Sequence, residues 1–474
     1  MQINRNMSAV IANNQLKGIE GRLSASIERL SSGLKINRAS DNPAGMAISN
    51  KMKAQIDALD QAEANAADGV SVVQIADGAL TEVSSILQRI RELSVQAANG
   101  VNSIDDRQSI QEEVDELVKE VDRISSDTEY NTKKLLDGSS NIRVYGENGS
   151  RYQVSDSVYA KVYSLNVESV AEQASVALDY EVPQADGVLE VNGVSANITK
   201  GMDKQAYLQA VRNAATEAGC SVEISEDGSK MMILSDYYGY NEEITVSMSE
   251  ELAVSAGITS HEDCEYIADE NLYKVRTTGV DAVVKIPTQL DASGFTTTTT
   301  VECNGNRVVV TDNDGFSIDF LLNEDYKPTA DAENGNFEID VTDIGSLTIQ
   351  IGANEYQTMD VRIDEISSYT LYLDCVDVVV ENGADRAMST LDEAIAKVSS
   401  ARSRIGAFQN RLEYAEKSLS SSVENITAAY SGLLDTDMAE EMTEYTQQNI
   451  LNQAAISVLS QANELPQQIL SMLQ

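Results

Sequence analysis

The single histidine of this chain stands in a short run of side chains that could bind a metal ion, His261-Glu262-Asp263-Cys264-Glu265. A zinc protease needs two histidines in a His-Glu-x-x-His motif, and histidine-based triads or multi-histidine metal centres need partners elsewhere in the chain. One histidine excludes the protease, and no second ligand motif follows at a suitable spacing. We therefore interpret the run as a solvated acidic loop rather than a metal site.

A second polar run, Asp312-Asn313-Asp314-Gly315, resembles the start of a calcium-binding loop. The glutamate that completes such a loop is missing at the required spacing, so a β-hairpin turn is the better interpretation. The sequence also shows no nucleophile–base pair and no glycine-rich phosphate loop. It predicts a protein that is not an enzyme and that needs no cofactor.

Four cysteines leave two redox states open. Cys220, Cys264, Cys303 and Cys375 could form two disulfides in three pairings, which is possible outside the reducing cytosol. Burial of the thiols, or production under anaerobic conditions, would leave all four free. We expect the free form.

The charge of the chain argues against several classes of partner. There are 34 Lys and Arg against 76 Asp and Glu, which gives a formal net charge of −42. Such a surface repels phosphate, so neither nucleic acid nor an anionic membrane is an expected partner. No window approaches 18 uncharged apolar residues, which predicts no transmembrane helix. The first residues, MQINRN, lack the apolar run of a secretory signal peptide.

Composition changes along the chain and indicates the fold class. Residues 141–380 hold 19 of the 24 Tyr and Phe, −29 of the net charge and all four cysteines. The two ends follow helical spacing, whereas the middle shows strand and turn signals. We predict a multidomain protein with a long α-helical coiled-coil or bundle core built from both chain ends. An α+β, mainly β, outer region is inserted between them.

The N-terminal 140 residues contain three helical stretches. Asn42-Pro43 starts a long helix that Asn99-Gly100 stops, and another helix begins near 103–106 and ends before 136–138. The stretch before them has apolar residues three and four apart, which is typical of a coiled-coil seam: Leu16, Ile19, Leu23, Ile27, Leu30 and Leu34.

The C-terminal residues repeat this pattern. Apolar positions between 391 and 419 predict one further long helix. In the last segment Pro466 either kinks the helix or begins a new first turn. Periodicity does not say whether the seam faces its own chain or a neighbouring copy. The last segment has two apolar rows, one of Leu451, Val458, Leu465 and Met472, and one of Ala455, Ala462 and Ile469.

The terminal rows predict only marginal stability when the two chain ends pair with each other alone. Burying them once supplies less free energy than ordering the backbone of both segments costs. Packing among many chains would bury both faces of each helix and reverse that balance. We therefore expect the two termini to become ordered on assembly.

The middle of the chain predicts small sheets around one short helix. The order suggests two subdomains, about 141–260 and 261–343. Five threonines at 296–300 allow a strand or an O-glycosylation target, and we favour the strand. A strand and turn are expected at 187–193, a helix at 204–218, and strands at 222–225, 231–235, 244–247, 298–303, 307–311 and 316–322.

Four motifs give the sequence a resemblance to the bacterial flagellin family. Two lie near the N-terminus, SSGLKINRASDNPAGMAIS at 31–49 and QRIRELSVQAANG at 88–100. Two lie near the C-terminus, GAFQNRLE at 406–413 and QANELPQ at 461–467. The resemblance covers roughly 1–138 and 345–474, well over half of the chain.

The resemblance implies a domain organisation. Residues 1–42 and 435–474 would be the N- and C-terminal inner-tube helices, and 43–140 the N-terminal part of an outer-tube helical domain. Residues 344–434 would supply a core β-hairpin, near 347–360, and the C-terminal part of that domain. Residues 141–343 would form an inserted, surface-exposed region.

The resemblance also implies a function. Such a chain would polymerise into the flagellar filament that drives swimming, outside the cell, after export through the flagellar type III apparatus without a cleaved signal peptide. Its partners would be further copies of itself, an export chaperone, the filament cap and hook-associated proteins. Two alternatives are a hook–filament junction protein and a monomeric adhesin with a helical stalk.

Flagellins are also ligands of the host receptor Toll-like receptor 5, which binds the outer-tube helices. By resemblance, the matching positions of this chain are Arg89, Leu93, Gln96 and Glu113. The same helical face would also pack subunit against subunit, so recognition would be a secondary property.

Overall fold

The computed structural model describes residues 6–155, 157–225, 227–260, 264–267, 272–287, 294–296, 298–328, 335–380 and 382–472, with the side chains of the last helix described to residue 464. The chain divides into two compact units. The first comprises 1–69, 349–359 and 411–474, and the second comprises 70–348 and 360–410. Two long helices, α2 (Pro43–Ala97) and α7 (Gly383–Leu434), contribute to both units.

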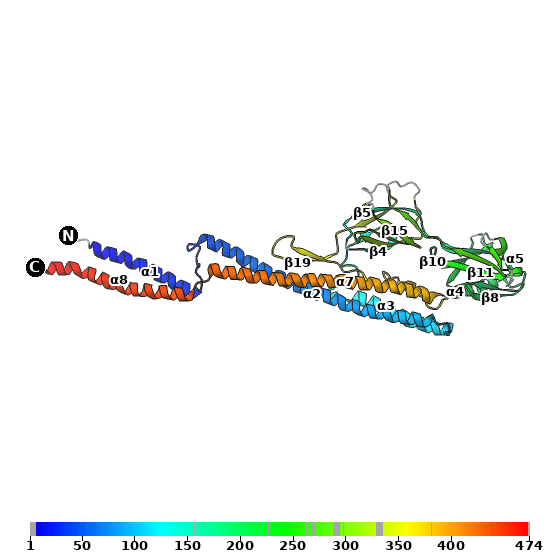
Figure 1. The fold of residues 1–474 in the computed structure, drawn as a ribbon, viewed down its shortest axis with the longest axis horizontal. Coiled ribbons are helices and arrows are strands. Elements are labelled where there is room, and N and C mark those ends of the chain that lie inside the picture. The colour runs from blue at the N-terminus through cyan, green and yellow to red at the C-terminus, as the bar shows by residue number, and fades with distance from the viewer. Residues whose placement is uncertain are drawn as a thin grey trace. The chain divides into compact units, whose positions relative to one another are not determined.

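The first unit contains an antiparallel pair made of the two chain ends, α1 (Met7–Ser32) and α8 (Met438–Met472), which lie side by side (Figure 1). Asn6 caps α1, and Gly33 ends it in the left-handed conformation at φ +72°, which favours glycine. Backbone hydrogen bonds join the base of the pair, from Lys35 to the carbonyl of Leu434 at 2.6 Å and from Thr436 to that of Gly33 at 3.0 Å.

The rest of the first unit packs α2 against α7 and a β-hairpin. The hairpin strands are β19 (Leu347–Gln350) and β20 (Thr358–Val361). Gly69 lets the hairpin approach α2 closely, because a Cβ there would lie 2.6 Å from Cδ1 of Ile349 and that side chain would have to shift. The apolar cluster consists of Leu59, Ala62, Ala66 and Leu419, with Ile351, Ala353, Val423 and Ile426 at its edge.

Within the second unit, three helices form a bundle. Between α2 and α3 (Ile104–Asp127) the chain turns at Ser103, whose capping box with Asp106 starts α3. Ion pairs join α2 to α7 in antiparallel order, Arg91 to Asp392 at 2.6 Å and Asp77 to Arg402 at 3.0 Å. The apolar stripe of α2 is fully buried and comprises Val73, Ala76, Leu80, Val83, Leu87 and Ile90.

The inserted region forms two modules, each with a hydrophobic core of its own. The host module comprises residues 142–171 and 282–341, and the nested module, residues 174–278, is inserted inside it. A β-bridge between Glu172 and Val280 joins the two ends of the nested module. The predicted border near residue 260 differs from this arrangement, because strands at 264–267 and 272–278 complete the nested sheet rather than starting a second subdomain.

The host module pairs two four-stranded sheets of orders β14-β5-β18-β3 and β15-β16-β17-β4. The first contains β3 (Val144–Tyr145), β5 (Lys161–Ser169), β14 (Val283–Lys285) and β18 (Phe337–Val341). The second contains β4 (Gly149–Val154), β15 (Thr300–Asn304), β16 (Arg307–Thr311) and β17 (Ser317–Leu322). A short hairpin, β1 (Glu129–Tyr130) and β2 (Lys133–Lys134), precedes the module.

The nested module packs helices on sheets of orders β6-β10-β9 and β12-β13-β11-β7-β8. Its helices are α4 (Lys204–Glu217), α5 (Glu250–Ser255) and the 3-10 turn η1 (Ile258–Ser260). Its strands are β6 (Gln173–Asp179), β7 (Gly187–Val191), β8 (Val194–Ile198), β9 (Cys220–Ile224), β10 (Lys230–Tyr238), β11 (Glu243–Ser249), β12 (Cys264–Ile267) and β13 (Leu272–Thr278).

The helix–sheet–helix order predicted from composition is confirmed, as are the hairpin near 347–360 and the turn at 312–315. The strand expected at 296–300 is wrong for Thr296, Thr298 and Thr299, because β15 begins at Thr300, and Thr297 lies outside the described residues. The hydroxyls of Thr296 and Thr298 instead donate to the carboxylate of Asp312, which holds this segment outside the ladder.

Two expectations about helices also change. α8 runs through position 466 to Met472, so no new helix begins at the proline. An 18-residue window of α2 has a mean hydropathy of 1.3, so by length and composition alone this one described helix is apolar enough to cross a membrane. That helix is rich in Ala and Val, and its apolar stripe packs inside the second unit.

Candidate assembly and recognition surfaces

The paired termini meet along two rows with alternating three- and four-residue spacing. On α1 the row facing α8 consists of Ala12, Leu16, Ile19, Leu23, Ser26 and Leu30. On α8 the facing row consists of Glu441, Tyr445, Gln448, Asn452, Ala455, Leu459 and Ala462. This heptad-like spacing is that of a coiled-coil contact, but three of the seven residues in the α8 row, Glu441, Gln448 and Asn452, are polar.

The predicted seam residues therefore divide into three groups. Ile19 and Ala462 are buried in the pair, while Leu16, Leu23, Leu30, Leu34 and Ala455 are half-buried. Ile27, Leu451 and Val458 are exposed, the last at 55%. The side chains of Leu465, Ile469 and Met472 lie outside the described part of the chain.

Three buried residues of the seam are polar, so apolar periodicity does not predict them. Ser26 is 1% exposed, and Glu441 and Gln448 are each 6% exposed. Glu441 pairs with Arg29 at 3.3 Å, but one oxygen of each of these three buried side chains has no hydrogen-bond partner among the described residues. Counting heptads back from Ala462 regardless of residue type would have found Gln448 and Glu441.

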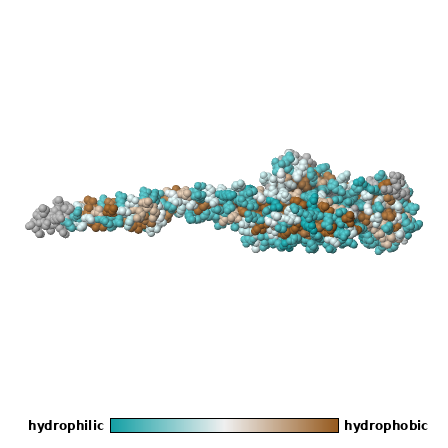
Figure 2. Space-filling model, turned by 60° about the horizontal axis from the view of Figure 1, so that its bottom comes forward, coloured by the Kyte–Doolittle hydropathy of each residue, from teal (hydrophilic) through white to brown (hydrophobic). Residues whose placement is uncertain are grey.

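The terminal pair also exposes apolar residues on its outer sides. Figure 2 shows hydrophobic residues on the surface of this part of the molecule. Ten large apolar side chains of the described part of the pair are exposed: Met7, Val10, Ile11 and Ile27 on α1, and Met438, Met442, Ile450, Leu451, Ile456 and Val458 on α8. A surface of this kind marks a site of association.

The proposed recognition residues lie on α2 and α3. Arg89 donates to a carboxylate oxygen of Glu113 at 2.7 Å and also pairs with Glu92 at 3.4 Å. The hydrogen bond from Arg89 to Glu113 is the main reason that the pKa of the Arg89 guanidinium is raised. Gln96 is exposed on the same helix, whereas Leu93 is only 2% exposed and packs beneath the surface.

The cysteines and the acidic run do not form a site in the described residues. All four cysteines are free thiols: Cys220 is buried, Cys264 and Cys303 are half-buried, and Cys375 is exposed. Burial raises the pKa of Cys220 to about 12, which keeps it protonated and unreactive. Residues 261–263 of the acidic run lie outside the described residues, and elsewhere in the described chain no group of three metal-ligating side chains occurs.

These features define a class of protein, an assembly subunit whose two ends pair as helices and whose middle carries an inserted α+β region. The N-terminal helical region of bacterial flagellin matches residues 3–141, and its C-terminal helical region matches residues 388–473. The chain is 31% identical to a flagellin of Clostridium tyrobutyricum, over 98% of this chain and 100% of that protein. It is 30% identical to a flagellin of Salmonella typhimurium, over 99% of each.

The chain belongs to the bacterial flagellin family. It is therefore a structural subunit of the flagellar filament. A solved structure, FliC from Burkholderia pseudomallei, is 18% identical over 72% of this chain and 99% of that one, with a TM-score of 0.24.

Proposed function

We propose that this chain polymerises outside the cell into a helical filament for swimming and that α1 and α8 make subunit contacts in it. The observation that carries the proposal is the exposure of ten large apolar side chains on two helices that already pack against each other. A second copy of the same helix pair offers matching apolar rows. Burying both sides of each helix would supply the free energy that a single pairing lacks.

The proposal includes ordering of the termini during assembly. Only three apolar residues of α1 and α8 are buried among those described, Ala12, Ile19 and Ala462. So small a contact gives the pair little independent stability, because ordering each residue costs about 1–2 kcal/mol. Such termini suit transit through the flagellar type III export apparatus, with an export chaperone.

The remaining partners in the proposal are the filament cap and hook-associated proteins, with no enzymatic activity, cofactor, nucleic acid or membrane partner. The net charge of −42 supports the exclusion of nucleic acid and anionic membranes. The structural role of the flagellin family supports the absence of catalysis.

Electron microscopy of the purified chain, with and without short filament seeds, tests the assembly function. We expect seeds to extend into long uniform filaments. Failure to extend seeds, under conditions in which a known flagellin does so, would favour a hook–filament junction protein or an adhesin. Circular dichroism of the monomer then separates these two, because an adhesin stalk must keep its terminal helices ordered alone.

The proposal includes recognition by Toll-like receptor 5 through the face made by Arg89, Gln96 and Glu113, which Leu93 supports from beneath. An exposed guanidinium held in place by a carboxylate is a suitable anchor for a partner surface. Reporter cells expressing the receptor test this with Arg89→Ala, and Arg123→Ala on α3 serves as a control for loss of an exposed paired arginine. Equal activation by both variants would contradict the assigned face.

A further inference from the structure

The inserted modules contact the helices of the second unit mostly through polar groups. The described hydrophobic cores of the host and nested modules include no residue of α2, α3 or α7. Two cavities, of about 920 and about 530 Å³, lie between the modules and α7. Both are lined by Arg151, Leu371 and Lys397, so the wall between the two cavities is where the modules and the helices meet.

At this wall three cations surround the ring of Tyr372. The guanidinium carbon of Arg151 lies 4.5 Å from the ring centroid, that of Arg307 lies 4.9 Å away, and Nζ of Lys397 lies 5.0 Å away. Arg151 comes from β4, Arg307 from β16 and Lys397 from α7, so one ring joins the host module to the helix. Each such contact is attractive, and more so when water is excluded.

Carboxylates balance the three cations. Asp319 of β17 accepts from Arg307 at 2.9 Å and from Lys397 at 3.1 Å, and therefore bridges the sheet to α7. Asp374 accepts from Arg151 at 2.6 Å, and Glu393 of α7 accepts from Arg307. Asp319 is buried, so its removal leaves two cations uncompensated, which costs far more than loss of a surface ion pair.

The segment that presents Tyr372 is fastened separately to α3. This strap, residues 364–380, includes the 3-10 turn η2 (Leu373–Cys375). Asp122 accepts hydrogen bonds from the backbone and hydroxyl of Ser368, both at 2.7 Å, and Gln111 accepts from the backbone of Val378 at 2.8 Å. Tyr372 itself has a left-handed backbone at φ +58°, a conformation that a tyrosine keeps only when its surroundings hold it there.

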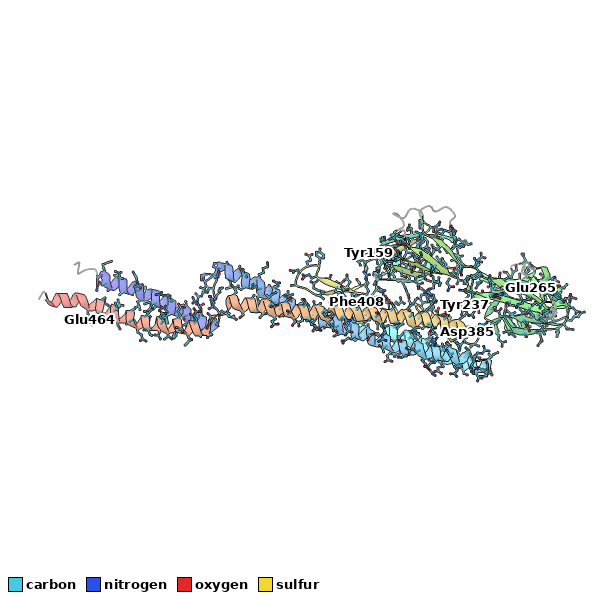
Figure 3. All side chains as sticks on the ribbon, in the orientation of Figure 1. Tyr159, Tyr237, Glu265, Asp385, Phe408 and Glu464 are labelled. Carbon is cyan, nitrogen blue, oxygen red and sulfur yellow. The ribbon has the colours of Figure 1, made fainter. Side chains whose placement is uncertain are left out.

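The nested module meets the same strap at a second point. The hydroxyl of Tyr237, on β10, donates to the carbonyl of Cys375 at 2.9 Å. The guanidinium of Arg386, in the first turn of α7, lies 4.9 Å from the ring centroid of Tyr237 and pairs with Glu242 at 2.9 Å. Tyr237 lies close to the start of α7 (Figure 3).

Two chain segments provide the covalent connection between the host module and the helices. Around 141–145 and 341–345 they run antiparallel and are joined by backbone hydrogen bonds, from Arg143 to the carbonyl of Ile344 at 3.1 Å and from Thr342 to that of Arg143 at 3.0 Å. One paired ribbon of this kind allows a module to swing unless a further contact fixes it.

We propose that Tyr372 and its three cations form a latch that fixes the inserted modules on the helices and that opens without unfolding either. The aromatic ring, rather than the hydroxyl, makes the contacts of the latch, because the Tyr372 hydroxyl is buried and has no hydrogen-bond partner among the described residues. The latch determines the orientation of the modules, a property separate from polymerisation by the termini.

Hydrogen exchange of the full-length chain tests the latch with Tyr372→Ala, and Tyr372→Phe is the matched control. Loss of the ring is expected to raise exchange about tenfold or more in the strap and around 141–145 and 341–345, while the cores of both modules keep their protection. Phenylalanine keeps the ring and should behave like the parent chain. Tyr159→Ala, at a tyrosine that is 78% exposed, controls for loss of any tyrosine.

Two results would overturn the latch. If hydrogen exchange in the strap is equal in Tyr372→Ala and Tyr372→Phe, the aromatic ring does not hold the three cations in place. An equal rise inside the module cores would show that the ring belongs to a common folding core. If Tyr372→Ala does not fold, Arg307→Lys gives a second test, because it keeps the charge but loses the bidentate fork to Asp319 and the stacking on Tyr372. Unchanged exchange in the strap of that variant would also reject the proposal.

Discussion

The terminal helix pair and the nested module bury their apolar residues to very different extents. In the nested module Leu189, Val191, Ile233, Ile244 and Val246 are all fully buried. In the terminal pair only three described apolar side chains are buried, and ten large ones are exposed. One region of the chain is complete by itself, and the other has the surface of a fragment of a larger core.

The polar residues of the two regions differ less, because Tyr207, Ser249 and Thr277 of the nested module also bury oxygens without a partner among the described residues. Asn192 of the nested module donates to the carbonyl of Glu243 and accepts from the backbone of Thr245 at 2.8 Å. In the seam, Ser26 and Gln448 are buried with oxygens that have no partner among the described residues. Buried groups of this kind weaken the pair in an isolated chain, because an unsatisfied oxygen keeps its desolvation cost.

The largest expected effect comes from charging the exposed apolar surface of the termini. Val458→Asp should leave the monomer folded, because the side chain faces solvent there, and should slow seed extension by about a hundredfold or more when the contact buries a carboxylate. Val188→Asp, at an exposed valine of β7, is the control and should extend seeds normally. Normal growth of Val458→Asp would place the subunit contact elsewhere.

Truncating the core of the nested module should lower the stability of that module and leave assembly unaffected. Leu189 is fully buried, so Leu189→Ala should destabilise that module by about 2–5 kcal/mol in thermal or denaturant unfolding. Seed extension should persist, because α1 and α8 are untouched. Loss of extension together with the module's stability would show that the two regions are not independent.

A smaller change should strengthen the terminal pair. Gln448→Leu removes a buried oxygen without a described partner and should stabilise the α1–α8 pair by about 1–3 kcal/mol, seen as slower hydrogen exchange of both helices in the monomer. Gln447→Leu changes the exposed neighbour and should leave exchange nearly unchanged. Faster exchange in Gln448→Leu would mean that the amide is satisfied in solution.

The smallest expected effect is a weakening of the latch at acid pH. Burial acts to raise the pKa of Asp319, but hydrogen bonds from Arg307 and Lys397 and their charges outweigh it, so the pKa lies below its usual 3.8. A carboxyl with a lowered pKa contributes stability that is present above about pH 4 and is lost as the pH falls through the lower folded value. Exchange in the strap should therefore rise only below about pH 4. Asp319→Asn should raise it already at pH 7 and remove this acid dependence.

Much of the fold was predictable because its signals are local. The cap at Asn42-Pro43, the strand and turn at 187–193, the helix at 204–218 and the turn at 312–315 depend on neighbouring residues, and each element appears near its expected place. The nested border was not predictable in this way. Strand β13 pairs with β11 across an intervening helix, and that pairing has no signature in either strand alone.

The surfaces were harder to predict than the elements. Apolar periodicity selected Ile27, but the buried position is its neighbour Ser26, because the facing row depends on the register with α8 rather than on hydrophobicity. Arg89, Gln96 and Glu113 come from matching family motifs, and no spacing rule reveals that Leu93 lies beneath them. The latch joins residues 151, 307, 372 and 397, whose meeting depends on the tertiary fold.

The bridge between Glu172 and Val280 makes the nested module exchangeable. Their backbones share two hydrogen bonds, of 2.8 and 3.0 Å, so the segments that lead into the module and out of it run side by side. A chain rejoined at these two residues would need no spacer, and a foreign domain with neighbouring termini could be spliced in at the same place. Such a graft would change the cargo carried by the chain while α1 and α8 keep their native sequence.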